Sequence, residues 1–454
     1  MTPPADLRSI ADVAPLVQRG EVSPVDLVRG CLARIEAGRD LNAFITVMAD
    51  AALEEAAAAQ RDIAAGRYRG PLHGIPVSLK DLIDVAGVPT TSGSAVPPRL
   101  PAHDAPVVRR LREAGAVIVG KTNLHEFAFG TTGDETAFGA VKHPFDTTRS
   151  AGGSSSGAAV ALIEGMCFLS LGTDTGGSIR IPAAACGVVG LKAAYGELSC
   201  EGIVPLSTTC DHVGPLARTV RDARIAFDAL SGTPHPASRP ERVTLGVPGG
   251  YLLERLDVHV RAALGRARIA LGQAGHTIRD VEIEHARMTP DIYLHIVLPE
   301  ASRYHAATLE AHAGAYSPGV RLRLEMGRYV LAEDYVRAMR LRDILRASVD
   351  RALDGCDALL LPALAIPAPP LGAASVGVDG SPEPVRAIML RLTQPFNLTG
   401  HPAIALPCGR TTSGLPVGMQ LVGRHGETGR LLDIAEALED HIAGGAGSVG
   451  GGTV

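Results

Sequence analysis

The amino-acid sequence predicts an α/β protein with a largely parallel sheet and helices on both faces. Short apolar runs that fit buried strands alternate with helical segments from about residue 70 to the C-terminus, the pattern of strands joined by crossover helices. Hydrophobic residues make up 46% of the chain and charged residues 20%, an ordinary globular composition. The 454 residues allow two or three domains, or one large domain with a big core.

The first 65 residues are predicted to be helical. Ser23 is suited to cap a helix and Pro24 to occupy its first position, so an amphipathic helix is expected through about Ile35. The Ala/Glu-rich segment 51–65 also has high helix propensity. The pattern then changes, and the apolar run at 75–79 predicts a buried strand that ends at Lys80.

Further helices and strands follow in alternation. A helix is predicted at 107–114, ended by Gly115, and a buried strand at 116–119. Two Gly/Ser-rich loops, at 150–157 and 172–178, are separated by a predicted helix of small residues at 158–165. Later elements are helices at 334–353 and 427–442, strands at 358–362 and 417–422, and a Gly-rich tail at 443–454 that is expected to be disordered.

Charge and cysteine content exclude several classes of protein. A net charge of -5 provides no basic surface for nucleic acid, and no basic amphipathic segment indicates membrane binding. Seven cysteines are scattered without a C-x-x-C pair, which favours reduced thiols in a cytoplasmic protein over disulfides or a zinc site. We recognise no signal peptide and no apolar run of about 18 residues, so no membrane-spanning helix is expected.

Lysine is scarce in this chain. Only Lys80, Lys121, Lys142 and Lys192 occur among 43 Lys and Arg residues. A desolvated Lys can lose its proton near neutral pH and act as a base, whereas Arg cannot. Compositional drift toward Arg could also leave a few lysines by chance. Because the four surround both Gly/Ser loops, this region is the predicted functional part of the chain.

Residues 115–122, GAVIVGKT, match the P-loop pattern of nucleotide-binding proteins letter for letter. A P-loop needs its four central residues free to wrap a phosphate, but residues 116–119 are predicted to be a strand. We therefore interpret Lys121 as a residue at a strand end with a local partner.

Residues 153–157, GSSSG, match the nucleophile elbow of α/β-hydrolases. That elbow directly follows a strand, whereas residues 143–149 are predicted to be a loop. The late histidines His401, His425 and His441 lie in no context that singles one out as a catalytic partner. The motif therefore does not indicate an α/β-hydrolase triad.

A third set of motifs is more specific. It comprises GIPVSLKDLIDVAG at 74–87, GGSSSG at 152–157, GTDTGGSIRIP at 172–182, LK at 191–192 and DHVGP at 211–215. In this order they resemble the amidase signature family of serine hydrolases. The resemblance extends to GLPVGMQLVG at 414–423 and is strongest over residues 70–222. It implies a single amidase domain at 1–442, with a central mixed, mostly parallel sheet covered by helices on both faces.

The resemblance also assigns roles to particular residues. Ser178 corresponds to the nucleophile, Ser154 to a proton relay and Lys80 to the general base, and the two serines are 24 residues apart, as in the family. The family holds the relay serine by a cis peptide bond, here to Gly153. Desolvation at the end of a strand would lower the pKa of Lys80 toward neutrality. The structural alternative for Lys80 is an ion pair with Asp81 or Asp84.

Other residues are expected to support these three. The family's oxyanion hole corresponds to the main-chain amides of Thr175, Gly176, Gly177 and Ser178, where Gly lets a substrate carbonyl approach closely. Ser155, Asp174 and Arg180 are expected to fix the loops by hydrogen bonds, with ordinary exposed polarity as the alternative for Ser155. No metal or cofactor is implied, because no cluster with ligand spacing accompanies the loops.

Some positions depart from the family pattern. Ala151 and Ala193 stand where Pro is usual. Loss of Pro could loosen the backbone and change the rate of hydrolysis, but it removes no reacting atom. Lys121 and Lys192 lie in motifs expected to be structural, so Arg should be tolerated there better than at Lys80. Lys142 has no motif context.

The implied reaction is hydrolysis of a carboxylic acid amide to a carboxylate and ammonia or an amine, through a Ser178 acyl-enzyme. Alternatives within the family are a carbamoyl or urea-derivative amidohydrolase and the glutaminase subunit of a tRNA-dependent amidotransferase. That glutaminase has an acidic residue seven positions before an Asn, whereas Leu390 precedes Asn397 here. A stand-alone amidase for small or aryl amides is therefore preferred, and a non-catalytic binding module is the alternative from another class.

Substrate-binding residues are less well defined. Arg342 lies in the helix that carries a substrate Arg in the glutaminase, but its neighbours Arg337, Arg340 and Arg346 favour a solvated face. The acyl pocket is expected within about residues 290–400, where an apolar site and core packing explain the large side chains equally well: Tyr293, Tyr304, Tyr316, Met326 and Tyr329. The expected partner is a small amide, and a homodimer is left open.

Overall fold

The centre of the molecule is a large mixed sheet. In the computed structural model, which describes residues 9–444, its eleven strands lie in the order β1-β3-β2-β6-β8-β7-β14-β15-β11-β9-β10. The strands are β1 Phe44–Val47, β2 Pro76–Lys80, β3 Val117–Thr122, β6 Leu169–Asp174, β7 Val189–Lys192, β8 His212–Ala217, β9 Thr244–Pro248, β10 Thr277–Val281, β11 Ala358–Pro362, β14 Ala403–Arg410 and β15 Pro416–Val422. Two small hairpins, β4 Lys142–His143 with β5 Asp146–Ser150 and β12 Ser375–Val378 with β13 Ser381–Pro384, lie apart from this sheet.

Parallel pairing occurs in two blocks of this sheet. Strand β2 is parallel to both β3 and β6, and β9 is parallel to both β10 and β11. The strands between and beside these blocks pair antiparallel. One reason is local, since β14 and β15 are joined by a short turn, and a short turn can connect only antiparallel neighbours. The predicted mixed α/β sheet is confirmed, with more antiparallel pairing than the alternation of elements indicates.

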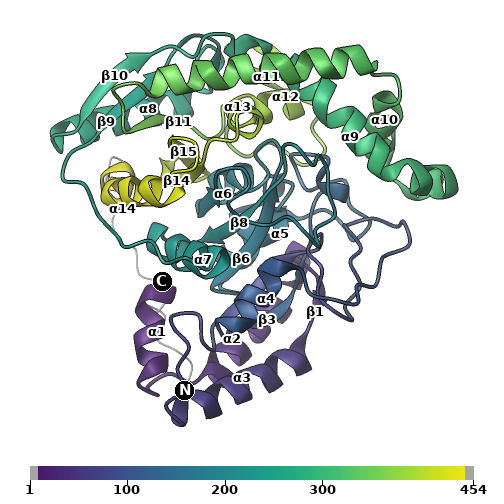
Figure 1. The fold of residues 1–454 in the computed structure, drawn as a ribbon, viewed down its shortest axis with the longest axis vertical. Helices are drawn as coiled ribbons and strands as arrows, with labels where there is room; N and C mark the ends of the chain where they lie inside the picture. Colours follow the sequence, from purple (N-terminus) through teal and green to yellow (C-terminus); the bar gives the residue numbers. More distant parts are fainter. Residues whose placement is uncertain (1–8, 445–454) are drawn as a thin grey trace.

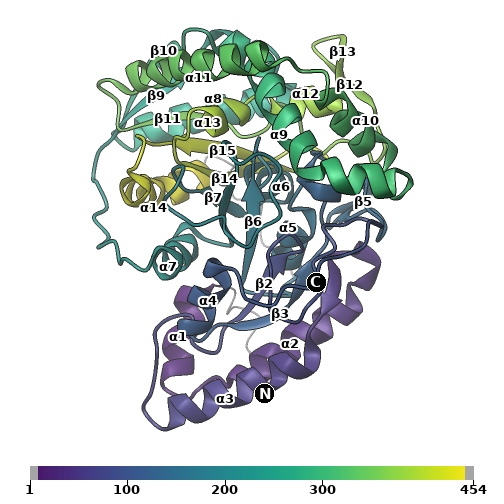
Figure 2. The ribbon, with the colours of Figure 1, turned by 45° about the vertical axis from the view of Figure 1, so that its right-hand side comes forward.

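Helices enclose the sheet (Figures 1 and 2). They are α1 Ile10–Gln18, α2 Pro24–Ala37, α3 Ala49–Ala64, α4 Pro106–Glu113, α5 Ser156–Ile163, α6 Arg180–Cys186, α7 Val220–Ser231, α8 Val258–Gln273, α9 Thr289–His312, α10 Pro318–Gly327, α11 Ala332–Leu353, α12 Val385–Leu390, α13 Gln394–Leu398 and α14 Thr428–Gly444. Every residue of β2, β6 and β8 is buried. Since successive side chains of a strand point to opposite faces, both faces of the central sheet are covered.

The N-terminal region is helical except for one strand. Ser23 caps α2, because its hydroxyl accepts a hydrogen bond from the Asp26 amide at 3.3 Å, as predicted. Helix α3 begins two residues before the predicted segment. Strand β1, which lies within the predicted helical region, pairs with the edge of β3. Its four residues are too few to show a pattern of their own.

Several predicted loops are partly regular structure. Residues 143–149 were expected to be a loop but mostly belong to the β4–β5 hairpin, which is separate from the main sheet. Strand β3 continues through Lys121 and Thr122, and β6 continues to Asp174, because both are buried next to paired neighbours. Helix α5 already begins at Ser156. Small and polar residues at these positions favour loops in the sequence, but burial lets them continue a strand or helix.

Two expectations concern the ends and the surroundings of the chain. Helix α14 includes residues 443 and 444, and the rest of the predicted tail, 445–454, lies outside the described residues. Within residues 9–444, no helix combines the length and the apolar character needed to span a membrane.

Lys121 stabilises the end of β3 through a buried ion pair. Its Nζ lies 2.8 Å from Asp81 Oδ1, and both side chains are completely inaccessible to solvent. The ammonium also donates to Thr90 Oγ1 at 3.0 Å and to the Pro89 carbonyl at 3.4 Å. The P-loop match is therefore a strand end held by a local ion pair, as interpreted from the sequence.

We predict that Asp81→Asn destabilises the protein. The substitution leaves a buried ammonium without its carboxylate, and removing one partner of a buried pair typically costs ~3 kcal/mol. Urea unfolding followed by circular dichroism should show a clear fall in the midpoint. Asp280→Asn is the matched control, since Asp280 forms an exposed ion pair with Arg268 and surface pairs contribute little. Equal midpoints for the two variants would contradict the interpretation.

Candidate active site

Lys80 ends β2 in a fully buried position, and its ammonium contacts two hydroxyl groups. Nζ donates to Ser154 Oγ at 2.7 Å and to Thr173 Oγ1 at 2.8 Å. The alternative of an ion pair with a neighbouring Asp is wrong, because Asp81 pairs with Lys121 and Asp84 pairs with Arg99 at 2.6 Å. Thr173 was not identified from the sequence, although it lies within the motif at 172–182.

Burial changes the titration of Lys80. Removal from water lowers the pKa of this amine to about 7, against the opposing influence of the Asp174 and Asp211 carboxylates. A neutral amine that accepts a proton from Ser154 is therefore available near neutral pH.

Ser154 lies in a crowded main-chain segment. Its peptide bond to Gly153 is cis, as the resemblance implied. A Cβ at Gly153 would lie 2.9 Å from the Thr131 carbonyl carbon, so no larger residue fits there. The Ser154 carbonyl accepts a hydrogen bond from the His125 amide at 3.1 Å.

Ser155 joins the two Gly/Ser loops. Its amide donates to the Ser178 carbonyl at 3.1 Å, and its hydroxyl donates to the Thr173 carbonyl at 3.2 Å. Ser155 is completely buried, so the alternative of exposed polarity is wrong. These contacts hold the loop that carries Ser154 against the loop that carries Ser178.

The segment from Asp174 to Arg180 is organised by a buried ion pair. The Arg180 guanidinium donates from Nε to Asp174 Oδ2 at 3.1 Å and from Nη2 to Oδ1 at 3.0 Å. The Asp174 carboxylate also accepts from the Ile179 amide at 3.1 Å and from Asn397 Nδ2 at 2.8 Å. Burial alone would raise the pKa of Asp174, but Arg180 holds it well below its usual range.

Four consecutive main-chain amides follow Asp174. Among the described residues, the N–H groups of Thr175, Gly176, Gly177 and Ser178 have no hydrogen-bond acceptor. Gly177 has φ 137°, a backbone conformation that favours glycine, and a Cβ there would lie 2.2 Å from Thr393 Oγ1. Unused donors in this arrangement can stabilise an anionic oxygen.

Ser178 closes this loop. It is 4% exposed, and its carbonyl is fixed by the Ser155 amide. The Thr393 hydroxyl donates to the Gly176 carbonyl at 2.5 Å, so a residue from the C-terminal third of the chain also anchors the loop. The sequence offered no signal for Thr393, because no motif connects it with the loop.

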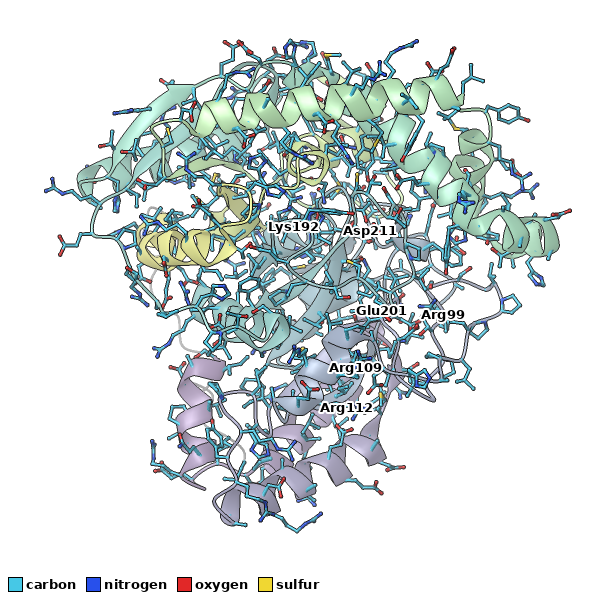
Figure 3. All side chains as sticks on the ribbon, viewed as in Figure 1. Arg99, Arg109, Arg112, Lys192, Glu201 and Asp211 are labelled. Atoms are coloured by element: carbon cyan, nitrogen blue, oxygen red, sulfur yellow. The ribbon has the colours of Figure 1, made fainter. Side chains whose placement is uncertain are left out.

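Asp211 lies where two neighbouring cavities meet, near the middle of the molecule (Figure 3). Its carboxylate accepts from Thr175 Oγ1 at 2.6 Å and from the Leu206 and Ser207 amides at 2.9 and 3.1 Å. Burial nevertheless raises the pKa of Asp211 to about 7. Asp211 therefore positions the first residue of the amide-bearing loop.

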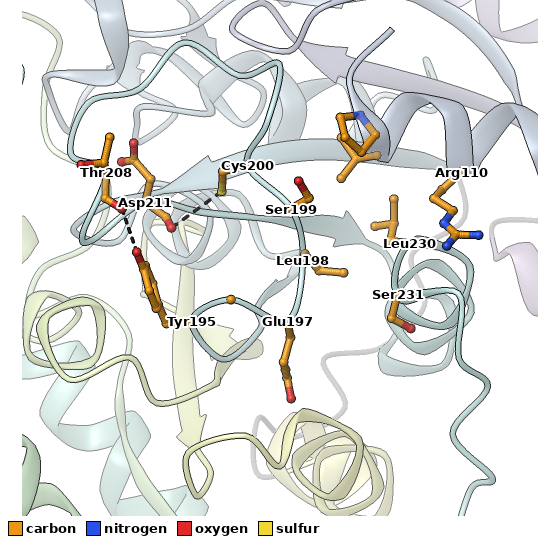
Figure 4. A pocket seen from close by; sticks show the side chains of 13 residues that line it. Arg110, Tyr195, Glu197, Leu198, Ser199, Cys200, Thr208, Asp211, Leu230 and Ser231 are labelled. Atoms are coloured by element: carbon orange, nitrogen blue, oxygen red, sulfur yellow. Dashed lines mark hydrogen bonds between the residues drawn. The ribbon is translucent and has the colours of Figure 1, made fainter. Parts of the chain in front are cut away.

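The two cavities differ in their relation to this loop. A cavity of 380 Å³ is lined by Thr173, Thr175 and Asp211, and thus reaches the groups around Lys80. A second cavity of 540 Å³ shares Asp211, Cys200 and Thr208 with the first. Figure 4 shows this second cavity, where the Tyr195 hydroxyl donates to the Thr208 carbonyl at 2.8 Å. The smaller cavity is the candidate substrate site because it contains the Lys80 partner Thr173.

Lys192 is buried beneath this region. Its Nζ donates to the His401 carbonyl at 2.6 Å and to the Ala193 carbonyl at 3.2 Å. Burial and the Arg180 charge lower the pKa of Lys192 well below its usual range. That Arg is tolerated better here than at Lys80 stays a prediction, although Arg would add a larger, permanently charged group to a buried position next to Arg180.

The positions that lack the usual Pro are held in other ways. Ala151 is buried, and its carbonyl accepts a hydrogen bond from Cys186 Sγ at 3.3 Å. The Ala193 carbonyl accepts from Lys192. Both segments are therefore fixed through their carbonyl groups.

Residues of the later helices pack against Gly176. A Cβ at Gly176 would lie 2.6 Å from the Tyr293 hydroxyl oxygen and 3.0 Å from Leu390 Cδ2. Tyr293 and Tyr316 are buried, but the other side chains proposed for the pocket or core are exposed: Tyr304 45%, Met326 49% and Tyr329 84%. Neither an apolar pocket nor core packing accounts for these three exposed side chains.

The arginines of α11 are not uniformly solvated. Arg337 and Arg340 are exposed. Arg342 is half-buried and donates to the Thr209 carbonyl at 3.5 Å, and Arg346 donates to the Thr399 carbonyl at 2.9 Å. The solvated-face interpretation therefore holds for the first two only. Both inner arginines are engaged by main-chain carbonyls.

No group of three or more His, Cys, Asp or Glu side chains within residues 9–444 is arranged to hold a metal ion. The chemical groups of the site are thus one amine, several hydroxyls and a row of main-chain amides. Such groups can perform proton transfer, nucleophilic attack and stabilisation of an anionic oxygen.

Several known proteins are similar to this chain in sequence or in structure. A family model described as Amidase matches residues 26–432. The A subunit of the glutamyl-tRNA(Gln) amidotransferase from Syntrophus aciditrophicus (strain SB) is 34% identical over 466 residues, covering 93% of this chain and 95% of that protein. A crystal structure of an amidase has a TM-score of 0.92 at 42% identity, covering 97% of this chain and 100% of that one. The native peptide amidase from Stenotrophomonas maltophilia has a TM-score of 0.82 at 30% identity, covering 97% and 98%.

The family match covers most of the chain, and these structural relatives share the mixed sheet and its helices. The chain therefore belongs to the amidase signature family, whose members hydrolyse amide carbon–nitrogen bonds.

Proposed function

We propose that this protein hydrolyses a small carboxylic acid amide through an acyl-enzyme on Ser178. The observation that carries the proposal is the buried Lys80 amine, 2.7 Å from Ser154 Oγ, beside a loop with four unused amides. A buried amine with a pKa of about 7 and no carboxylate in contact with it is suited to general-base chemistry rather than to a structural ion pair.

The first half of the reaction forms the acyl-enzyme. Neutral Lys80 accepts the proton of Ser154, which accepts the proton of Ser178 as Ser178 Oγ attacks the amide carbon. The amides of residues 175–178 stabilise the resulting oxyanion, and loss of one such donor typically costs ~3 kcal/mol in the barrier. The proton returns through Ser154 to the leaving nitrogen as the carbon–nitrogen bond breaks.

The second half releases the acid. Water attacks the Ser178 ester, its proton passes through Ser154 to Lys80, and the same amides stabilise the second oxyanion. The carbon–oxygen bond to Ser178 then breaks, and Ser178 Oγ regains a proton. Lys80 thus acts as a base when its amine is neutral and as an acid when the amine is protonated.

A second candidate is the glutaminase subunit of an amidotransferase, because several sequence relatives are A subunits of such enzymes. Position 390 bears on this choice, since Leu390 lies against Gly176. An apolar side chain there cannot hold the α-ammonium group of glutamine. We therefore favour a stand-alone amidase, and the partner protein and a homodimer are left to experiment. All seven cysteines are unpaired thiols, which supports the proposal of a cytoplasmic location.

Ser178→Ala is expected to abolish amide hydrolysis and labelling by a fluorophosphonate probe, with no change in the circular dichroism spectrum. The reason is that only the nucleophilic oxygen is removed. Mass spectrometry of the labelled wild-type protein should locate the probe on Ser178. Folded wild-type protein that takes up no probe would favour the binding module instead.

The pH dependence of kcat/KM is expected to follow Lys80. Because the neutral amine is the active form, kcat/KM should rise as pH increases through about 7 and then reach a plateau. Lys80→Ala should lower kcat by ~100-fold or more, and Lys80→Arg should be nearly as damaging because Arg stays protonated.

Asp211→Asn provides the control for that assignment. The Asp211 carboxylate raises the pKa of Lys80, so its removal should move the acidic limb of the profile to lower pH. If the fall in kcat/KM at low pH disappears in Asp211→Asn but persists in Lys80→Ala, the titrating group is Asp211.

Ammonia release from a panel of aliphatic, aryl and carbamoyl amides and glutamine should separate the candidate functions. A stand-alone amidase should turn over simple amides without a partner and should leave glutamine largely intact. Preference for glutamine would instead identify the glutaminase of an amidotransferase.

A further inference from the structure

A half-buried arginine beside the Phe129 ring forms no ion pair with a described residue. Arg386 lies in α12, and its guanidinium carbon is 5.6 Å from the centre of the Phe129 ring. Among the described residues it forms neither a hydrogen bond nor an ion pair. Burial and the neighbouring Arg323 charge lower the pKa of this guanidinium to about 10, although the Glu135 carboxylate acts in the opposite direction.

Neighbouring arginines are paired. Arg323, which lies over the same Phe129 ring at 5.3 Å, forms an ion pair with Glu135 at 3.2 Å. Arg391 donates to the Tyr251 carbonyl and faces Glu254 at 3.5 Å. Arg386 is therefore exceptional among the arginines around Phe129 and at the end of α12.

The position of Arg386 relates it to the amide-bearing loop. Arg386 and Leu390 are four residues apart on one helix, so they lie on the same face. Leu390 Cδ2 would be 3.0 Å from a Cβ at Gly176, and Arg386 lies one helical turn along α12 from that contact.

Tyr293 is near both Gly176 and Arg386. Its hydroxyl oxygen would be 2.6 Å from a Cβ at Gly176, and its phenol group is close enough to Arg386 for the guanidinium to oppose the rise in the pKa of Tyr293 that burial causes. Tyr293 is 3% exposed, yet its hydroxyl forms no hydrogen bond with a described residue. Two unpaired donors, one cationic and one neutral, therefore border the acyl side of the loop.

We propose that Arg386 and Tyr293 bind a carboxylate on the acyl part of the substrate, so that the preferred substrate is the monoamide of a dicarboxylic acid. This inference rests on the proposed amide hydrolysis. A carboxylate would supply the acceptors that both donors lack, and an Arg–carboxylate contact in a site of low dielectric is strong and directional. One helical turn, a rise of ~5 Å, allows a short chain between the carboxylate and the amide carbon.

The test compares acidic amides with neutral amides of the same chain length. Succinamate and glutaramate should have kcat/KM values at least ~10-fold above those of butanamide and pentanamide for the wild-type protein. Arg386→Gln should lower this acidic-to-neutral ratio by ~10- to 100-fold, the usual size of a charged hydrogen bond. Arg386→Lys should be intermediate, and Tyr293→Phe should have a smaller effect in the same direction.

Two controls separate substrate binding from a structural role. Arg328→Gln, which alters an exposed arginine at the end of α10, should leave the ratio as in the wild type. The thermal midpoint of Arg386→Gln should equal or exceed that of the wild type, because a half-buried charge without an ion pair is removed. A large fall in the midpoint with an unchanged ratio would assign Arg386 a structural role and overturn the proposal.

Protection of Ser178 from the fluorophosphonate probe gives a readout that does not depend on turnover. Succinamate should slow the labelling of wild-type protein more than butanamide does, and Arg386→Gln should lose the difference. Equal protection by both compounds would overturn the assignment of a carboxylate site. Absence of any labelling of Ser178 would instead contradict the proposed hydrolysis itself.

Discussion

The ion pair between Asp174 and Arg180 is the interaction on which the arrangement of this site depends. It joins the two ends of the loop that carries four unused amides and Ser178, and both partners are fully buried. Arg180 also donates to Gln420 and Asn397, so residues from the last quarter of the chain hold the same loop. A buried charge pair is stable only when its remaining hydrogen-bonding capacity is used, and this requirement ties β6, α13 and β15 together.

The proposed chemistry depends on the absence of a carboxylate in contact with Lys80. Lys80 contacts only hydroxyl groups, whereas Lys121 contacts the Asp81 carboxylate and Lys192 contacts main-chain carbonyls. Burial penalises the ammonium form in each case, but only Lys80 adjoins a serine that can exchange a proton with it. Environment therefore gives three buried lysines different functions.

The proposed site draws on two parts of the chain. The groups proposed for bond cleavage come from residues 80–215, where the motifs resemble those of the family. Tyr293 of α9 and Leu390 of α12 lie next to Gly176, Arg386 lies on the same helix as Leu390, and none of the three belongs to a family motif. Similarity to amidases and to part of an amidotransferase establishes the reaction class, and we propose that these side chains select the amide.

The sequence by itself determined the α/β class, the helix cap at Ser23 and the motif order that brings Lys80, Ser154 and Ser178 into consideration. These features depend on local propensity and on spacing, which are properties of short segments. Tertiary packing shows in addition that Ser155 is buried, that Lys80 avoids Asp81 and Asp84, and that Thr393 contacts the loop at 175–178. These relations join positions up to 217 residues apart and depend on how side chains pack in the interior, which no local pattern records.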